Sequence, residues 1–169
     1  MVGIALVGFW AGSNIHAQNV WAGRFAYEPT GESAYPSHEF SLDLGGNYAT
    51  RDKSGHDTDA WGLTVGVNYF FTEHFGIGAD TYADAFTRPY LLNGSVIYRH
   101  PLKEFGLAPY GFAGFGRQWE HAGQWTGHLG AGLEYRLNAH TGLFLDARRV
   151  FADQTKDYAV WRAGLRLGF

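Results

Sequence analysis

Cysteine is absent from this 169-residue chain, lysine occurs only at positions 53, 103 and 156, and charged residues of all kinds make up 17%. The missing cysteine excludes a disulfide framework, a thiolate metal site and a cysteine nucleophile. Soluble domains carry roughly 25% charged residues, so the charged fraction of this chain is low for a protein whose surface faces water. The formal net charge of −3 gives no electrostatic basis for a nucleic-acid partner.

Long hydrophobic runs are missing as well, although 46% of the residues are hydrophobic and 17% are aromatic. A transmembrane helix needs an uninterrupted apolar run of about 18 residues or more, and the chain has none after its first residues. Apolar and polar residues are interleaved instead, which favours strands over transmembrane helices. The length fits a single domain.

The first residues carry a targeting pattern. An apolar stretch from Val2 to Ala11 is followed by small and polar residues and by a cleavage-type alanine at Ala17. This pattern predicts a signal peptide over residues 1–17; the run is too short to span a bilayer as a helix. No Lys or Arg precedes it, so a buried first element is the alternative. Residues 18–37, with two prolines and scattered aromatics, are predicted to form an irregular segment.

From residue 38 onward, apolar and polar residues alternate in segments of about ten to twelve residues separated by turn signals. Because hairpin-length links join these segments, we predict eight antiparallel strands. They cover residues 38–49, 60–71, 75–86, 90–99, 109–119, 125–137, 141–151 and 158–169. Eight such strands can form either a sandwich or a closed barrel.

The two faces of these strands indicate which side meets water. The polar faces are rich in glycine and ionic groups, and lysine is confined to the links. Aromatic residues gather toward the strand ends in two belts, as at the two interfaces of a bilayer. One belt contains Tyr69, Phe71, Phe75, Tyr98, Tyr110, Tyr135 and Phe169; the other contains Tyr48, Trp61, Trp119, Trp125, Phe151, Tyr158 and Trp161. We therefore predict an all-β, eight-stranded, antiparallel up-and-down transmembrane β-barrel over residues 38–169.

The polar faces then line the lumen, where charges balance. An eight-stranded barrel leaves an interior that side chains fill, so charges there need partners. We predict a lumen ion-pair network and a closed interior rather than a conducting channel. Its predicted members are Glu39, Asp43, Asp80, Asp84, Glu134 and Asp146 with Arg99, Arg117, Arg136, Arg148, Arg162 and Arg166.

The stretches "PYGFAGFG" (109–116), "GAGLEYRL" (130–137) and "GLFLDARRVF" (142–151), within the eight-strand pattern, resemble small outer-membrane β-barrels of the OmpA-like, OmpX and OmpW kind. The resemblance implies a bacterial outer-membrane location, with the short turns on the periplasmic side. It also implies a C-terminal signal read by the barrel-assembly machinery. That pattern (polar, any, glycine, any, any, hydrophobic, any, aromatic) falls on Arg162, Gly164, Leu167 and Phe169.

We predict a structural or interaction role, no enzymatic activity and no cofactor. The partners expected are outer-membrane lipid, the assembly machinery and an envelope protein bound through residues 18–37 or the outer loops. Lipid-modifying enzymes of this scaffold are the alternative, as is a narrow channel for small hydrophobic solutes. The nearest catalytic candidate is His56 with Ser54 and Asp57, and the other histidines weighed are His121 in an outer-side link and His128 on the inner face of the sixth strand. No pair of histidines has metal-ligand spacing on one face.

Overall fold

The computed structural model describes residues 34–50, 60–84, 88–119, 123–152 and 157–169, without the side chains of residues 60, 84 and 88–90. The predicted signal peptide, residues 1–17, and most of the segment 18–37 lie outside these ranges. Within them no helix is both long and apolar enough to cross a membrane.

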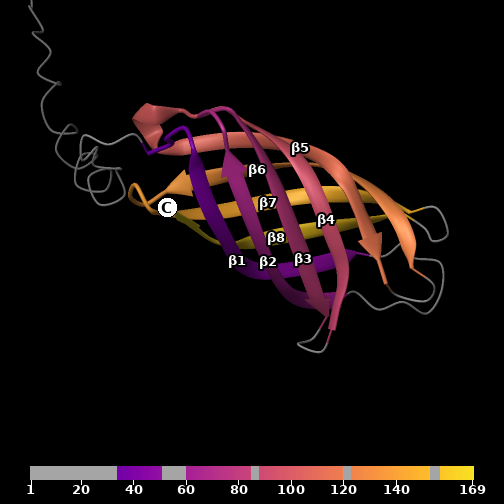
Figure 1. Ribbon diagram of the computed structural model, residues 1–169. Helices are drawn as coiled ribbons and strands as arrows, with labels where there is room; N and C mark the ends of the chain where they lie inside the picture. The colour runs from indigo at the N-terminus through magenta and orange to yellow at the C-terminus, as the bar shows by residue number, and fades with distance from the viewer. Residues whose placement is uncertain (1–33, 51–59, 85–87, 120–122, 153–156) are drawn as a thin grey trace, which may run out of the picture.

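Eight antiparallel strands close into one barrel in chain order, and the last strand pairs with the first (Figure 1). The predicted fold class is confirmed. The strands are β1 (Glu39–Thr50), β2 (Ala60–Phe70), β3 (Phe75–Asp84), β4 (Arg88–Arg99), β5 (Leu107–Gln118), β6 (Gln124–Arg136), β7 (Thr141–Ala152) and β8 (Tyr158–Gly168). Closure leaves no unpaired edge along the sheet.

The two ends of the barrel differ. We call one the turn end, because it holds the links 71–74, 100–106 and 137–140 and the C-terminus. The link 100–106 contains a short helix, η1 (Lys103–Phe105), which ends at Gly106 with φ 62°, a left-handed conformation that suits glycine. The opposite end, between β1 and β2, β3 and β4, β5 and β6, and β7 and β8, is the loop end.

Apolar side chains cover the outside of the barrel, which is the reverse of a soluble barrel. On β2, Leu63, Val65 and Val67 are exposed while Thr64 and Asn68 are buried. Exposed aromatic residues form two belts. They are Tyr69, Phe71, Phe75, Tyr98 and Phe169 toward the turn end, and Trp61, Trp119, Trp125, Phe151 and Trp161 toward the loop end. Two residues expected in these belts, Tyr110 and Tyr158, instead point into the lumen and are buried.

The seam between β1 and β8 depends on two glycines that are paired in register, Gly45 and Gly164. A Cβ added to Gly164 would lie 2.2 Å from the carbonyl oxygen of Leu44, and one on Gly45 would lie 2.2 Å from that of Ala163. Real Cβ atoms do not approach backbone this closely. At this one pair, therefore, the backbones of β1 and β8 come close together because neither residue carries a side chain.

Candidate functional site in the barrel lumen

Side chains that alternate inward from all eight strands fill the lumen. Among the described residues, ten of these side chains are charged and buried, and the five acids and five arginines among them sum to no net formal charge. The acids are Glu39, Asp43, Asp80, Glu134 and Asp146, and the arginines are Arg99, Arg136, Arg148, Arg162 and Arg166. Arginine suits such a site because its planar head donates several hydrogen bonds at once.

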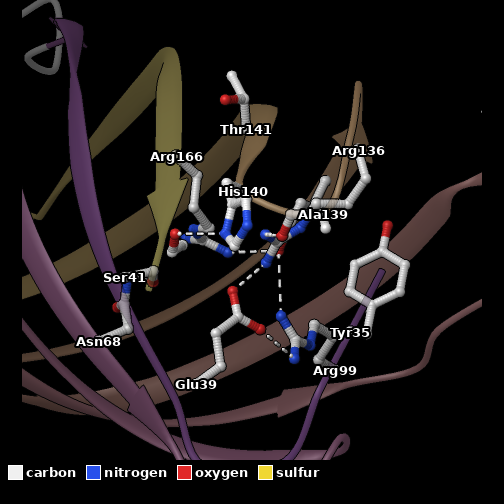
Figure 2. Close-up of polar contacts among 12 residues, drawn as sticks. Tyr35, Glu39, Ser41, Asn68, Arg99, Arg136, Ala139, His140, Thr141 and Arg166 are labelled. Carbon is white, nitrogen blue, oxygen red and sulfur yellow. Dashed lines mark hydrogen bonds and ion pairs between the residues drawn. The ribbon is translucent and has the colours of Figure 1, made fainter. Parts of the chain in front are cut away.

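Six of these residues form a cluster near the turn end. Glu39 pairs with Arg99 at 2.9 Å and also with Arg136 (Figure 2). Glu134 accepts from Arg166 at 2.6 Å and lies 3.7 Å from Arg99. The remaining contacts join Glu134 to Arg136 and Arg166 to Asp43. Each carboxylate touches at least one guanidinium, which offsets the cost of burying it.

Tyr35, just ahead of β1, covers this cluster. Its hydroxyl donates to the carbonyl oxygen of Gly106 at 2.7 Å. Its ring lies under two guanidinium groups, 4.9 Å from that of Arg99 and 5.2 Å from that of Arg136, within cation–π range (Figure 2). The side chain is wholly buried, and this burial raises the pKa of its phenol. The end of the segment 18–37 is thus held at the mouth of the barrel.

A second cluster of four charged residues lies closer to the loop end. Arg148 donates to Asp80 at 3.0 Å, and Arg162 donates to Asp146 at 2.7 and 2.8 Å. Arg162 also lies 3.4 Å from Asp80, which joins the two pairs. Neutral groups also donate hydrogen bonds to these carboxylates. Asn93 donates to Asp80 at 3.0 Å, and Tyr110 donates to Asp146 at 2.8 Å.

Aromatic rings link the two charged clusters. The ring of Phe144 lies 5.7 Å from the guanidinium of Arg162 and 5.6 Å from that of Arg166. Tyr110 donates to Asp146 in one cluster while Arg166 of the other lies 5.3 Å from its ring. Toward the loop end the lumen is filled by buried apolar contacts among Ala49, Tyr82, Leu91, Val150, Tyr158 and Val160. Buried side chains thus contact one another both near the turn end and toward the loop end of the described lumen.

The structure thus brings together ten of the twelve residues predicted for the lumen. The side chain of Asp84 lies outside the described residues. The prediction for Arg117 is wrong, because its side chain is exposed on the outer wall, 5.6 Å from the Trp125 ring. The inward residues of β5 are Tyr110, Phe112 and their even-numbered neighbours, one residue out of step with the predicted face.

A buried pair inside the barrel escaped the sequence analysis. Ser95 on β4 and His128 on β6 are joined by a 2.8 Å contact between Oγ and Nε2. Among the described residues no partner reaches His128 Nδ1, so the pair lacks the group that orients the base in Ser–His nucleophiles. His56, Ser54 and His121 lie outside the described residues. Nor does the described part of the chain hold three acidic or histidine side chains grouped for a metal ion.

The four residues of the predicted assembly signal all lie on β8 or just beyond it. Arg162 points into the lumen and pairs with Asp146, and Gly164 occupies the tight seam with β1. Leu167 lies on the outward side, and Phe169 is 73% exposed with its ring 6.2 Å from that of Phe40. Two of the four positions therefore have packing roles in the folded barrel.

Comparison with known proteins places the fold. Residues 32–169 match the model of the family described as "Outer membrane protein beta-barrel domain". The chain belongs to this family. It is a bacterial outer-membrane β-barrel protein; the strand pattern and the faces predicted the barrel, and the resemblance implied the location. No curated protein sequence matches the chain.

Solved structures share the barrel at low sequence identity. The N-terminal β-barrel domain of Pseudomonas aeruginosa OprF has a TM-score of 0.61 and 17% identity, covering 79% of this chain and 98% of that one. OprG from the same organism has a TM-score of 0.59 and 11% identity, covering 80% and 97%. Ail, the attachment invasion locus protein of Yersinia pestis, has a TM-score of 0.57 and 15% identity, covering 79% and 99%.

Proposed function

We propose that this outer-membrane barrel is closed and non-catalytic, with a structural or interaction role. The observation that carries the proposal is the neutral ion-pair network of ten buried residues. An ion crossing the lumen would have to separate pairs such as Arg162 with Asp146 and Arg166 with Asp43. Separating buried pairs leaves uncompensated charges, each costing several kcal/mol, or about 3–5 kcal/mol when one partner is lost.

Conductance in planar bilayers tests this proposal. We expect the folded, heat-modifiable protein to give no unitary conductance. A double variant, Asp80→Ala with Arg148→Ala, should raise ion leakage because it empties part of the loop-side cluster. The matched control is Glu73→Gln with Lys103→Gln, which removes an exposed 2.5 Å pair at the turn end and should stay silent. Stable unitary openings of the unmodified protein would show that the lumen conducts and end the proposal.

The interaction role rests on segments outside the barrel wall. We propose that an envelope protein binds residues 18–37 or the outer loops, and that the assembly machinery binds the terminal strand. Burial of Tyr35 supports the first idea, because it fixes the segment's end against Arg99 and Arg136. A photocrosslinker at Phe25 should then capture an envelope protein in cells, whereas one at the lipid-facing Leu129 should not. Equal capture at both positions would contradict it.

A further inference from the structure

A groove of about 730 Å³ lies in the outer wall of the barrel. Side chains of Ile77, Val96, Phe115 and Phe151 border it, and its lining is almost wholly apolar. Phe115 is 76% exposed and Val96 is 62% exposed, so within the described residues the protein itself does not cover them. In a membrane this hollow meets lipid.

Two outward-facing glycines make the hollow. Gly94 on β4 and Gly127 on β6 are both neighbours of Phe115 in the strand register. A Cβ on Gly127 would meet nothing within 4 Å, and one on Gly94 would come no closer than 3.9 Å to any atom. Close backbone packing does not require glycine at either position, in contrast with Gly164. These glycines instead leave room beside the Phe115 ring.

A cation, Arg117, lies at the loop end of the groove. Arg117 follows Phe115 by two residues on the same face of β5, and the register places it between Leu92 and Trp125. Its guanidinium lies 5.6 Å from the Trp125 ring, and among the described residues no carboxylate pairs with it. Arg149, the other outward arginine of the described strands, pairs with Asp157 at 3.3 Å. A charge on the lipid face is costly unless it reaches the interface or a counter-ion.

The aromatic belt indicates how deep in the membrane Arg117 lies. Trp119 and Trp125 are exposed on the same wall, and such tryptophans mark the level of the lipid headgroups. Arg117 therefore lies where lipid phosphates lie, while the groove below it lies among acyl chains. Arginine binds phosphate with two parallel hydrogen bonds, which gives geometric as well as electrostatic selectivity.

We propose that the groove and Arg117 form one binding site for a phosphate-bearing, multiply acylated lipid. One acyl chain lies along the groove over Gly94 and Gly127, and the lipid phosphate accepts hydrogen bonds from Arg117. This site is on the outside of the barrel, so it does not depend on whether the lumen is closed. At the loop end, the protein would thus bind one lipid at a defined site, in addition to its general contact with the bilayer.

Native mass spectrometry of the folded, full-length protein in detergent tests the site. The probes are lipid A and the same lipid with its phosphates removed. We expect lipid A to bind at one saturable site and to bind about tenfold more tightly than the dephosphorylated lipid, as for a charge-assisted contact. Each sample is first checked for its heat-modifiable band, so that only folded barrels are compared.

Two variants separate the parts of the site, each with a matched control. Arg117→Gln should weaken binding of lipid A about tenfold and leave binding of the dephosphorylated lipid unchanged. Arg149→Gln, which removes the outward arginine that already has a partner, should have no effect. Gly127→Leu, whose added Cβ would meet nothing within 4 Å, places an apolar side chain in the groove and should weaken both lipids. Gly111→Leu is its control, because Gly111 is also outward, lies outside the groove, and has no atom closer than 3.8 Å to an added Cβ.

The outcomes divide cleanly. Loss of phosphate preference in Arg117→Gln together with weaker binding of both lipids to Gly127→Leu supports the site. Equal binding of lipid A by all four variants overturns it. Dimers that Gly127→Leu abolishes, with no lipid retained by the unmodified protein, would also overturn it, because the groove would then be a contact between two copies of the barrel.

Discussion

Arg166 on β8 donates to both carboxylate oxygens of Asp43 on β1, with each N–O distance 2.7 Å. The two residues are also direct neighbours in the register of the seam. The first and last strands, whose pairing closes the barrel, are therefore joined by a bidentate, buried ion pair as well as by backbone hydrogen bonds. The same Arg166 reaches Glu134 on β6, so the seam is also tied to a strand two positions away around the wall.

Asp43→Ala should lower the free energy of unfolding by about 3–5 kcal/mol, because it leaves Arg166 short of a counter-ion inside the lumen. Urea unfolding in detergent, followed by tryptophan fluorescence, measures this change. In the double variant Asp43→Ala with Arg166→Ala, Glu134 still contacts Arg99 and Arg136. The double variant should thus lose clearly less than the sum of the two single variants, with a coupling of about 1 kcal/mol or more. Strict additivity would mean that the pair does not stabilise the seam.

Gly164→Ala should destabilise the barrel by about 1–3 kcal/mol and slow its refolding into detergent, since the added methyl group overlaps the Leu44 carbonyl. Gly46→Ala is the matched control. Gly46 lies on β1 at the same seam, faces outward, and has no atom closer than 3.8 Å to an added Cβ. Refolding without any assembly machinery isolates the packing effect. Equal refolding of the two variants would show that Gly164 is not needed for closure and matters only as part of the predicted signal.

Phe169→Ala should reduce the amount of barrel assembled in cells several-fold while costing only about 1 kcal/mol in unfolding, the value of an aromatic pair. The ring is 73% exposed, and Phe40 is its aromatic neighbour. Phe40→Ala removes the same ring contact from the other side and keeps the C-terminal residue. The heat-modifiable band in outer-membrane fractions measures assembly. If Phe40→Ala assembles as poorly as Phe169→Ala, the loss comes from stability and not from recognition.

Tyr35 should make the free energy of unfolding of the barrel fall as the pH rises above about 10. Burial raises the pKa of its phenol in the folded protein above the unfolded value of about 10. The folded state thus favours the neutral phenol. Its contribution is fully present below pH about 10 and is lost as the pH rises further, because the unfolded chain releases the proton first. We expect the unmodified protein to lose more stability above pH 10 than Tyr35→Phe, which keeps the ring but cannot ionise. Parallel stability curves would refute the role given to Tyr35.

Alternation along the chain was enough to predict the fold and most inward faces. A strand such as β2 carries Leu63, Val65 and Val67 on one side and small or polar residues on the other, so one register satisfies both lipid and lumen. Glycine and aromatic residues blur this pattern on β5. There Tyr110 and Phe112 point inward while Phe115 points outward, so the predicted face was one residue out of step with the structure. Arg117 and Trp119 are two residues apart and therefore lie on the same face of the strand. This pairing with an outward tryptophan is the signal that could have placed Arg117 on the outer wall.

The partners within the lumen could not be predicted in the same way. Alternation says that Ser95 and His128 face inward, but which side chains meet depends on the stagger between strands and on residues across the barrel. Arg166 and Asp43 are 123 positions apart, and no local pattern links them. Tyr35 lies in a segment without periodicity, so nothing in the sequence distinguished it from the other aromatic residues nearby. Only the closed geometry shows that its ring meets Arg99 and Arg136.

The balance of five acids against five arginines has an electrical consequence. A potential across a membrane does work on a mobile charge in proportion to that charge, about 2.3 kcal/mol per elementary charge for 100 mV. On an electrically neutral set of paired groups, the forces on anions and cations cancel. Moving the described lumen charges together across the membrane would therefore carry no net gating charge, and only a displacement of anions relative to cations, which their pairing opposes, would respond to voltage.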